Sequence, residues 1–157
     1  MPVPLFVTSL DAYQGQIAER LTAVAQSGRY ILGPEVKEFE KELADYLGVA
    51  HAIGVGNGTD ALTIALRALG VKAGTEVIVP SFTFYASVEA VLNAGALPVF
   101  ADVDPATMNV TRQTVQEKLT DDTAAILPVH LFGNPAPINE LMGLGVPVLE
   151  DAAQAIG

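Results

Sequence analysis

Residues 55–60 of the chain combine residue types that can bind an anion. The sequence Val-Gly-Asn-Gly-Thr-Asp ends an apolar run, turns on two glycines and leads into a helical pattern that starts at Ala61. Glycines let the backbone approach an anion and adopt positive φ, while the free N–H groups of a helix start and the Thr59 hydroxyl supply donors. Asn57, Gly58 and Thr59 therefore form a candidate phosphate cradle, although the same turn taken alone also fits a simple helix cap.

Residues 148–155 form a second candidate segment, in which Asp151 and Gln154 follow an apolar run. A carboxylate at the end of a buried strand is costly unless a cation or several donors pair with it. Asp151 could therefore bind a cationic group of a ligand, or it could cap a following helix. Pyridoxal phosphate combines an anionic end for the cradle with a cationic ring nitrogen for Asp151. Gln154 could donate to the oxygen substituent of that ring or pack along it.

An aromatic cluster between these segments could supply a wall for such a ring. Residues 80–85 read Pro-Ser-Phe-Thr-Phe-Tyr and open a predicted helix. A flat heteroaromatic ligand needs a flat apolar partner, and the direction of the helix favours Phe84 or Tyr85 over Phe82 for this role. The alternative is that all three aromatic side chains belong to the core.

The elements that must position these residues follow from the pattern of apolar residues. Two helices are predicted first, at residues 10–27 and 34–47. After residue 51, short apolar runs alternate with helical patterns, which is typical of βαβ units. The expected strands are 52–55, 76–79, 97–101, 124–129 and 146–150, and the expected helices are 60–69, 84–93, 111–119 and 138–142.

This order predicts an α/β fold of three layers, with a mainly parallel sheet covered by helices on both faces. Ligands of such sheets collect at the carboxyl ends of the strands. The candidate residues fall at those ends, because the cradle follows the first expected strand and Asp151 follows the last. The sequence therefore predicts that they share one site.

Composition and charge narrow the classes of partner. The formal net charge is −10 and the chain has no cluster of Lys or Arg, so we expect no nucleic-acid partner. The chain contains no cysteine, which excludes disulfides and thiolate metal sites, and His51 and His130 are too isolated to suggest metal ligands. No run reaches membrane-spanning length and the first residues do not resemble an export signal, so we expect no membrane partner and a cytoplasmic protein.

Several ordered motifs resemble those of the DegT/DnrJ/StrS family of nucleotide-sugar aminotransferases, which are pyridoxal phosphate enzymes of fold type I. The matching motifs are residues 57–62, 80–84, 102–105, 128–133 and 150–155. The resemblance implies a helical arm at residues 1–29 and an incomplete cofactor-binding large domain at residues 30–157.

The resemblance also implies roles for the candidate residues. Gly58, Thr59 and Asp60 would hold the cofactor phosphate. Phe84 would stack on the pyridine ring, Asp151 would bond the ring nitrogen and Gln154 would support the ring. The implied reaction transfers an amino group from a donor such as glutamate to a nucleotide-linked keto sugar, in a homodimer of the full-length protein. His130 resembles the family's histidine before the Gly133 turn, with a structural role near the site.

One departure from the family concerns the lysine that forms the Schiff base, which lies after the aspartate–glutamine segment in such enzymes. The four lysines of this chain all come earlier, at positions 37, 41, 72 and 118. The sequence is therefore expected to be an N-terminal fragment that is inactive alone and contains no catalytic residue. The alternatives are a sugar dehydratase of the same family, with histidine in place of the lysine, a non-catalytic α/β domain that binds another phosphate ligand, and a remnant without a ligand. The dinucleotide motif Gly-x-Gly-x-x-Gly is not met after Gly56.

Overall fold

The computed structural model describes residues 10–156 and divides the chain into two compact units, Met1–Gly54 and Val55–Gly157. This division lies elsewhere than the predicted boundary between the arm and the large domain, at residue 29. That boundary stays a prediction. No described helix combines the length and the apolar character needed to cross a bilayer.

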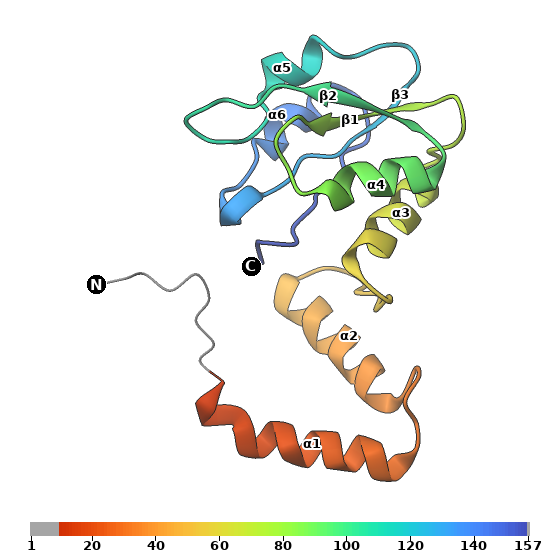
Figure 1. Ribbon diagram of the computed structural model, residues 1–157, viewed down its shortest axis with the longest axis vertical. Coiled ribbons are helices and arrows are strands. Elements are labelled where there is room, and N and C mark those ends of the chain that lie inside the picture. The colour runs from red at the N-terminus through yellow and green to blue at the C-terminus, as the bar shows by residue number, and fades with distance from the viewer. Residues whose placement is uncertain (1–9, 157) are drawn as a thin grey trace. The chain divides into compact units, whose positions relative to one another are not determined.

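The first unit consists of helices (Figure 1). A short 3-10 helix, η1 (Asp11–Tyr13), leads into α1 (Gln14–Ser27), and α2 (Pro34–Leu47) follows. Both α-helices end at a glycine in the left-handed region, Gly28 at φ 68° and Gly48 at φ 66°, a conformation that other residues adopt only at a cost. The two helices predicted for this region are confirmed.

The second unit is built on three parallel strands. β1 (Glu76–Pro80) lies between β2 (Leu97–Ala101) and β3 (Thr123–Ile126). In this register Ile78 pairs with Val99 on one side and with Ile126 on the other. The parallel sheet predicted from the apolar runs is confirmed.

Helices cover both faces of this sheet, as Figure 1 shows. α3 (Gly58–Ala68) and α4 (Tyr85–Ala94) pack against each other, and their apolar cluster includes Val77, Val79 and Leu127. α5 (Arg112–Gln116) and α6 (Ile138–Met142) contribute to the opposite cluster, which includes Ile78 and Ile126. Successive strand residues alternate between the two clusters because side chains of a strand point to opposite faces. The three-layer α/β prediction is confirmed.

A fourth segment, residues 147–151, extends the sheet beyond β3. Ile126 N–H donates to Pro147 O at 2.9 Å, and Asp151 N–H donates to Pro128 O at 2.9 Å. The structure has two isolated parallel bridges here rather than the continuous strand that the sequence predicts at 146–150. The reason is Pro128, which has no N–H to donate at the position between the two bridges.

The predicted strand at residues 52–55 is wrong. These residues have no strand conformation, and Ile53 is 79% exposed. A strand needs a neighbour to accept and donate its backbone hydrogen bonds, and no segment within residues 10–156 pairs with this one. An apolar run alone therefore did not decide its conformation.

Candidate functional site

The start of α3 has the free donors expected of an anion site. Asn57 precedes the helix, and its Oδ1 accepts from Asp60 N–H at 2.8 Å. Its Nδ2 donates to Asp60 Oδ2 at 2.8 Å, so Asn57 and Asp60 hold each other. The amides of Gly58 and Thr59 come before the helical ladder, and within the described residues no acceptor is bonded to them or to the Thr59 hydroxyl.

The backbone conformation of the two glycines in this turn differs from the prediction. Neither Gly56 nor Gly58 has positive φ, so the turn does not depend on the left-handed region. A Cβ built on Gly58 would meet no heavy atom within 4 Å, which means that the space above this residue is open. The turn thus fits both a helix cap and a cradle, and it has room for a ligand.

Asp151 lies where the sheet fixes its backbone and buries its carboxylate. Its N–H donates to Pro128 O, and its C=O accepts from His130 N–H at 3.0 Å. The residue is only 8% exposed. Its Oδ2 accepts from the Ser87 hydroxyl at 2.8 Å and its Oδ1 accepts from Ala153 N–H at 3.2 Å. In the part of the chain that the structure describes, no Lys, Arg or His forms an ion pair with this carboxylate.

Ser87 was not among the predicted site residues, and it is the side chain that contacts Asp151 most directly. It lies in the first turn of α4 and is 1% exposed. Its hydroxyl also lies 3.2 Å from the Thr83 hydroxyl, so that a chain of two hydroxyls ends on the carboxylate. Thr83 and Ser87 are four residues apart at the start of a helix, a spacing that can be seen in the sequence. Asp151, the residue that accepts from Ser87, is 64 residues away from it, and no local sequence pattern indicates this contact.

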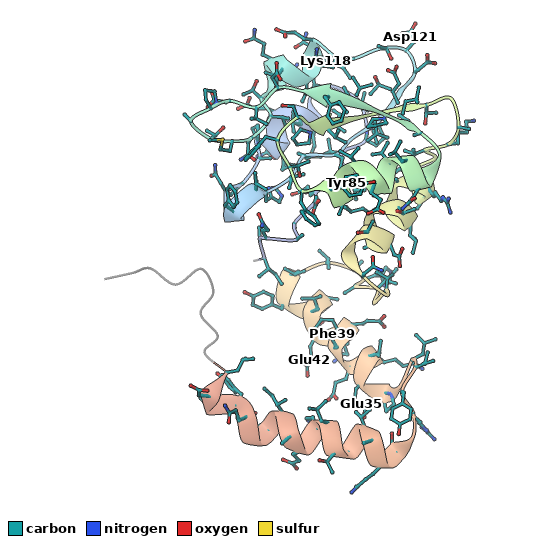
Figure 2. The ribbon with its side chains drawn as sticks, in the orientation of Figure 1. Glu35, Phe39, Glu42, Tyr85, Lys118 and Asp121 are labelled. Carbon is teal, nitrogen blue, oxygen red and sulfur yellow. The ribbon has the colours of Figure 1, made fainter. Side chains whose placement is uncertain are left out.

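The aromatic residues near the start of α4 are exposed. Phe84 precedes the helix and is 74% exposed, and Tyr85 at the start of the helix is also exposed (Figure 2). The alternative that these side chains belong to the core is wrong. Ser87 N–H donates to Phe84 O at 3.3 Å, so Phe84 lies one helical turn from the residue that bonds Asp151. A free aromatic face at this position can receive a flat ring.

Gln154 turns toward the 3-10 helix η2 (Leu131–Gly133). Its Oε1 accepts from Phe132 N–H at 2.7 Å, which leaves its amide N–H groups as donors. Phe132 has φ 57°, a left-handed conformation that is uncommon for a residue with a side chain. The predicted contact of Gln154 with a ligand stays a prediction.

His130 and Glu150 form a pair beside Asp151. Ala136 N–H donates to His130 Nδ1 at 3.0 Å, so the other ring nitrogen carries the proton and donates to Glu150 Oε2 at 2.9 Å. His130 is buried and links the η2 turn to the last segment of the sheet. Its contacts are with the protein itself, in agreement with the structural role expected of it.

One apolar cluster supports all three candidate segments. Leu62 of α3, Val88 of α4 and Leu149 of the last segment pack against the same core of buried residues. These three residues lie close in sequence to Thr59, Ser87 and Asp151. The fold therefore packs α3, α4 and the last segment of the sheet against one apolar cluster.

The residues of this site fit pyridoxal phosphate. A buried carboxylate with two donors and no cation suits a protonated ring nitrogen, and free amides at a helix start suit a phosphate. Asp102 and Asp104 do not contribute: Asp102 accepts from Ser81 at 3.4 Å, and Asp104 caps its own turn by accepting from Ala106 N–H at 2.8 Å. Within the described chain, no three His, Cys, Asp or Glu side chains gather as a metal site would require.

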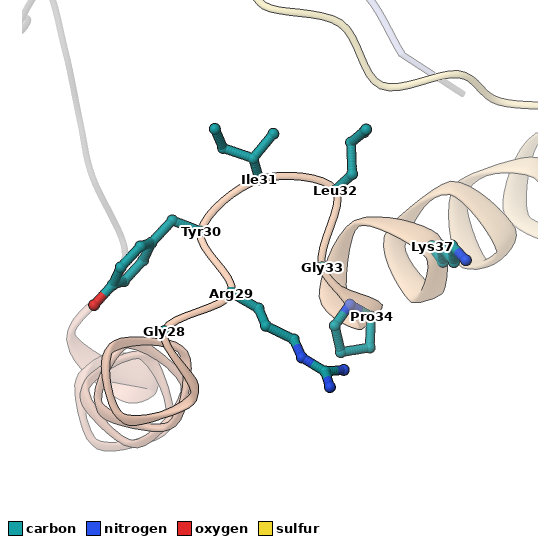
Figure 3. A pocket seen from close by; sticks show the side chains of 8 residues that line it. All are labelled: Gly28, Arg29, Tyr30, Ile31, Leu32, Gly33, Pro34 and Lys37. Atoms are coloured by element: carbon teal, nitrogen blue, oxygen red, sulfur yellow. The ribbon is translucent and has the colours of Figure 1, made fainter.

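A separate hollow of about 470 Å³ lies in the first unit and contains none of these residues. The loop between α1 and α2 and the start of α2 line this hollow, as Figure 3 shows. Tyr30, Ile31 and Leu32 of this loop are strongly exposed, and Leu32 has φ 51°. Its lining also includes Arg29 and Lys37.

Comparison with known proteins identifies the family of this chain. The profile of the DegT/DnrJ/EryC1/StrS aminotransferase family matches residues 11–157. The UDP-2-acetamido-2-deoxy-3-oxo-D-glucuronate aminotransferase of Pseudomonas aeruginosa is 45% identical over 94% of the chain and 44% of its own length. The dTDP-3-amino-3,4,6-trideoxy-alpha-D-glucose transaminase of Streptomyces venezuelae is 46% identical over 97% of the chain and 42% of its own length.

A solved structure is similar over the same range. The structure of NtdA from Bacillus subtilis with bound cofactor PMP superposes with a TM-score of 0.90 at 34% identity. It covers 99% of this chain, which in turn covers 38% of that one. The chain thus spans less than half the length of each of these relatives.

Proposed function

Because the chain belongs to the DegT/DnrJ/EryC1/StrS aminotransferase family, we propose that it carries the cofactor-binding part of a pyridoxal phosphate-dependent sugar aminotransferase. The proposed reaction moves an amino group from an amino acid, with glutamate as the first choice, to a nucleotide-linked keto sugar. UDP- and dTDP-linked sugars appear in the names of two relatives and are the first substrates to test.

The observation that carries this proposal is the environment of Asp151. Its carboxylate is 8% exposed and has two hydrogen-bond donors but no cation within the described residues. A buried carboxylate is favourable only with adequate partners. A cationic ring nitrogen would provide the missing charge, and when bound the cofactor supplies the electron sink that amino transfer requires.

The other residues would hold the two ends of the cofactor. The amides of Gly58 and Thr59 and the Thr59 hydroxyl would donate to the phosphate, while Asp60 would fix Asn57 and through it the turn. Phe84 would cover one face of the ring, and the amide N–H groups of Gln154 would face its oxygen substituent. Together with Asp151, the residues Gly58, Thr59, Asp60, Phe84 and Gln154 are the cofactor-binding set that the sequence predicts.

The proposed chemistry also needs a lysine amine that forms a Schiff base with the cofactor. None of the four lysines in this sequence fits that role. Lys37, Lys41, Lys72 and Lys118 are all exposed. Residues 30–157 would therefore contribute cofactor binding and ring orientation, and the 157 residues by themselves are expected not to transfer amino groups.

A homodimer is part of the proposal. The first unit exposes Ile31 and Leu32 in its loop, which extend to the same side of the chain in Figure 3, and Phe39 on α2. Exposed apolar residues of this kind suit an interface with a second subunit. The cytoplasmic location stays a prediction.

The test is titration of the protein, as its complete gene encodes it, with pyridoxamine 5'-phosphate and with pyridoxamine. Both lack an aldehyde, so binding does not depend on a Schiff base. We expect the phosphorylated compound to bind at least tenfold more tightly, because only it reaches the start of α3. Transfer of nitrogen from labelled glutamate to a UDP- or dTDP-linked keto sugar would then identify the substrate. Equal affinity for the two compounds, or no binding, would contradict the proposal.

A further inference from the structure

Thr83, Ser87 and Asp151 form a continuous hydrogen-bonded chain at the end of the sheet. The Ser87 hydroxyl donates to Asp151 Oδ2 at 2.8 Å and lies 3.2 Å from the Thr83 hydroxyl. Ser87 is fully enclosed, whereas Thr83 is half-buried. The Ser87 hydroxyl and Ala153 N–H are the donors that the described residues offer to the carboxylate.

The direction of this chain follows from the number of protons. Each hydroxyl has one proton to donate, and an ionised carboxylate can only accept. If Ser87 gives its proton to Asp151, its own oxygen accepts from Thr83. The Thr83 hydroxyl therefore selects the orientation of the Ser87 hydroxyl that serves Asp151, and a hydrogen bond to a charged acceptor of this kind is stronger than a neutral one.

The position of Ser87 also connects two parts of the cofactor site. Ser87 N–H donates to Phe84 O, so one turn of α4 carries both the proposed wall of the ring and the donor to Asp151. The backbone of Asp151 is fixed by the sheet, but its carboxylate can still rotate about the side-chain bonds. Ser87 and Ala153 N–H each hold one carboxylate oxygen and so fix that rotation.

We propose that Ser87 is a positioning residue that orients the Asp151 carboxylate toward the ring nitrogen of the cofactor, with Thr83 orienting Ser87. This inference rests on the proposed function, because it requires a cofactor ring at Asp151. Ser87 itself does not touch the ring. It acts through Asp151, and its removal leaves the phosphate-binding start of α3 unchanged.

The test uses pyridoxamine 5'-phosphate with ¹⁵N at the ring nitrogen, bound to the protein as its complete gene encodes it. The ring ¹⁵N chemical shift reports whether the nitrogen is protonated and hydrogen-bonded. We expect Asp151→Asn to move this shift furthest from the wild-type value and Ser87→Ala to move it part of the way. We also expect Ser87→Ala to weaken binding about tenfold. Thr83→Val should act in the same direction with a smaller effect, and Ser87→Thr should retain the wild-type shift.

A double variant separates positioning from a general structural role. If Ser87 acts through Asp151, Ser87→Ala causes no further change of the ring ¹⁵N shift when Asp151→Asn is already present. Thr111→Val, which removes a hydroxyl that caps α5, is the matched control and should leave the shift unchanged.

Three outcomes would overturn the inference. The first is a wild-type ¹⁵N shift in both Ser87→Ala and Thr83→Val. The second is a Ser87→Ala effect that persists in the Asp151→Asn background. The third is a result that contradicts the proposed function as well. This would be a wild-type protein that does not bind the cofactor, or an Asp151→Asn variant whose ring ¹⁵N shift equals that of wild type. If Ser87→Ala does not fold, the Thr83→Val result decides, because the Thr83 hydroxyl is bonded to Ser87 and not to the Asp151 carboxylate.

Discussion

The two ends of the proposed cofactor site are built in different ways. At the start of α3, the groups available to a ligand are backbone amides and a hydroxyl that have no acceptor within the described residues. At Asp151, the carboxylate is buried and both oxygens are already bonded to Ser87 and Ala153. The phosphate end is therefore completed by the ligand, whereas the ring end is organised by the protein before any ligand arrives. Substitution of the buried carboxylate should therefore change binding more than removal of one donor at the phosphate end.

The largest expected effect is that of Asp151→Asn. Asparagine keeps the shape and can accept from Ser87, but it removes the charge that the ring nitrogen requires. Loss of one partner of a buried charged pair costs about 3 kcal/mol, so we expect roughly 100-fold weaker binding of pyridoxamine 5'-phosphate. Isothermal titration calorimetry measures this change. A loss of less than about threefold would mean that Asp151 serves only the turn that follows it, through Ala153 N–H, and is not the partner of a ring.

Thr59→Val should have the next largest effect. The variant removes one hydroxyl donor to the phosphate while the backbone amides remain, and we expect about tenfold weaker binding. The free energy of unfolding without ligand should stay within about 0.5 kcal/mol of wild type, because this hydroxyl has no partner in the described structure. Chemical denaturation with and without the cofactor compares the two effects. A large loss of stability in the ligand-free protein would show that the Thr59 hydroxyl already has a partner within the protein. The phosphate end would then be organised before a ligand binds, as the ring end is.

Asn57→Ala tests the local cap of α3. The variant loses the hydrogen bond from Asp60 N–H and should lower the free energy of unfolding by about 1 kcal/mol, measured by denaturation without ligand. Asn57→Ser is the matched control and should retain most of that stability, because the serine hydroxyl can still accept from Asp60 N–H and places no second charge beside the Asp60 carboxylate. Equal loss in both variants would show that the side-chain amide bonded to Asp60, and not the cap, provides the stabilisation.

Gly58→Ala is expected to have the smallest effect on stability. A Cβ at this position meets no heavy atom within 4 Å and φ is not positive, so the change in the free energy of unfolding should stay within about 0.5 kcal/mol. Binding of the cofactor phosphate should nevertheless weaken, because a methyl group would occupy the space that the phosphate approaches. Unchanged affinity in calorimetry would favour a helix cap over a phosphate cradle at this turn.

Elements with strong local signals were predicted well from the sequence. The bounds of α2, β2 and α6 agree with the predicted helices and strand, because proline and glycine mark the ends of α2 and buried apolar runs mark the sheet. Residues 52–55 carry an apolar run of the same kind but no strand, because a strand also depends on a neighbour that the run itself does not specify. The short α5 shows a similar limit, since its helical pattern continues beyond the residues that form the helix.

The candidate site shows the same division between local and long-range information. Asp151 and the turn at Gly58 were indicated by their own residue types and by family motifs. Ser87 was missed because its function depends on a contact across 64 residues. Positive φ was expected of the cradle glycines, but the structure uses it at other positions, such as Gly133. Residue type indicated what the turn could bind and not the backbone conformation that it adopts.

The two backbone hydrogen bonds of Asp151 have a consequence for how new specificities can arise. These two bonds pair the backbone of Asp151 with residues 128 and 130. Hydrogen exchange of the Asp151 amide should therefore be as slow as that of amides in the buried strands. Loops at the ends of strands tolerate change far more readily than the strands themselves. Relatives built on this plan could therefore diverge in the sugars they accept by altering loops, while the residue that we propose to bind the ring nitrogen stays in place.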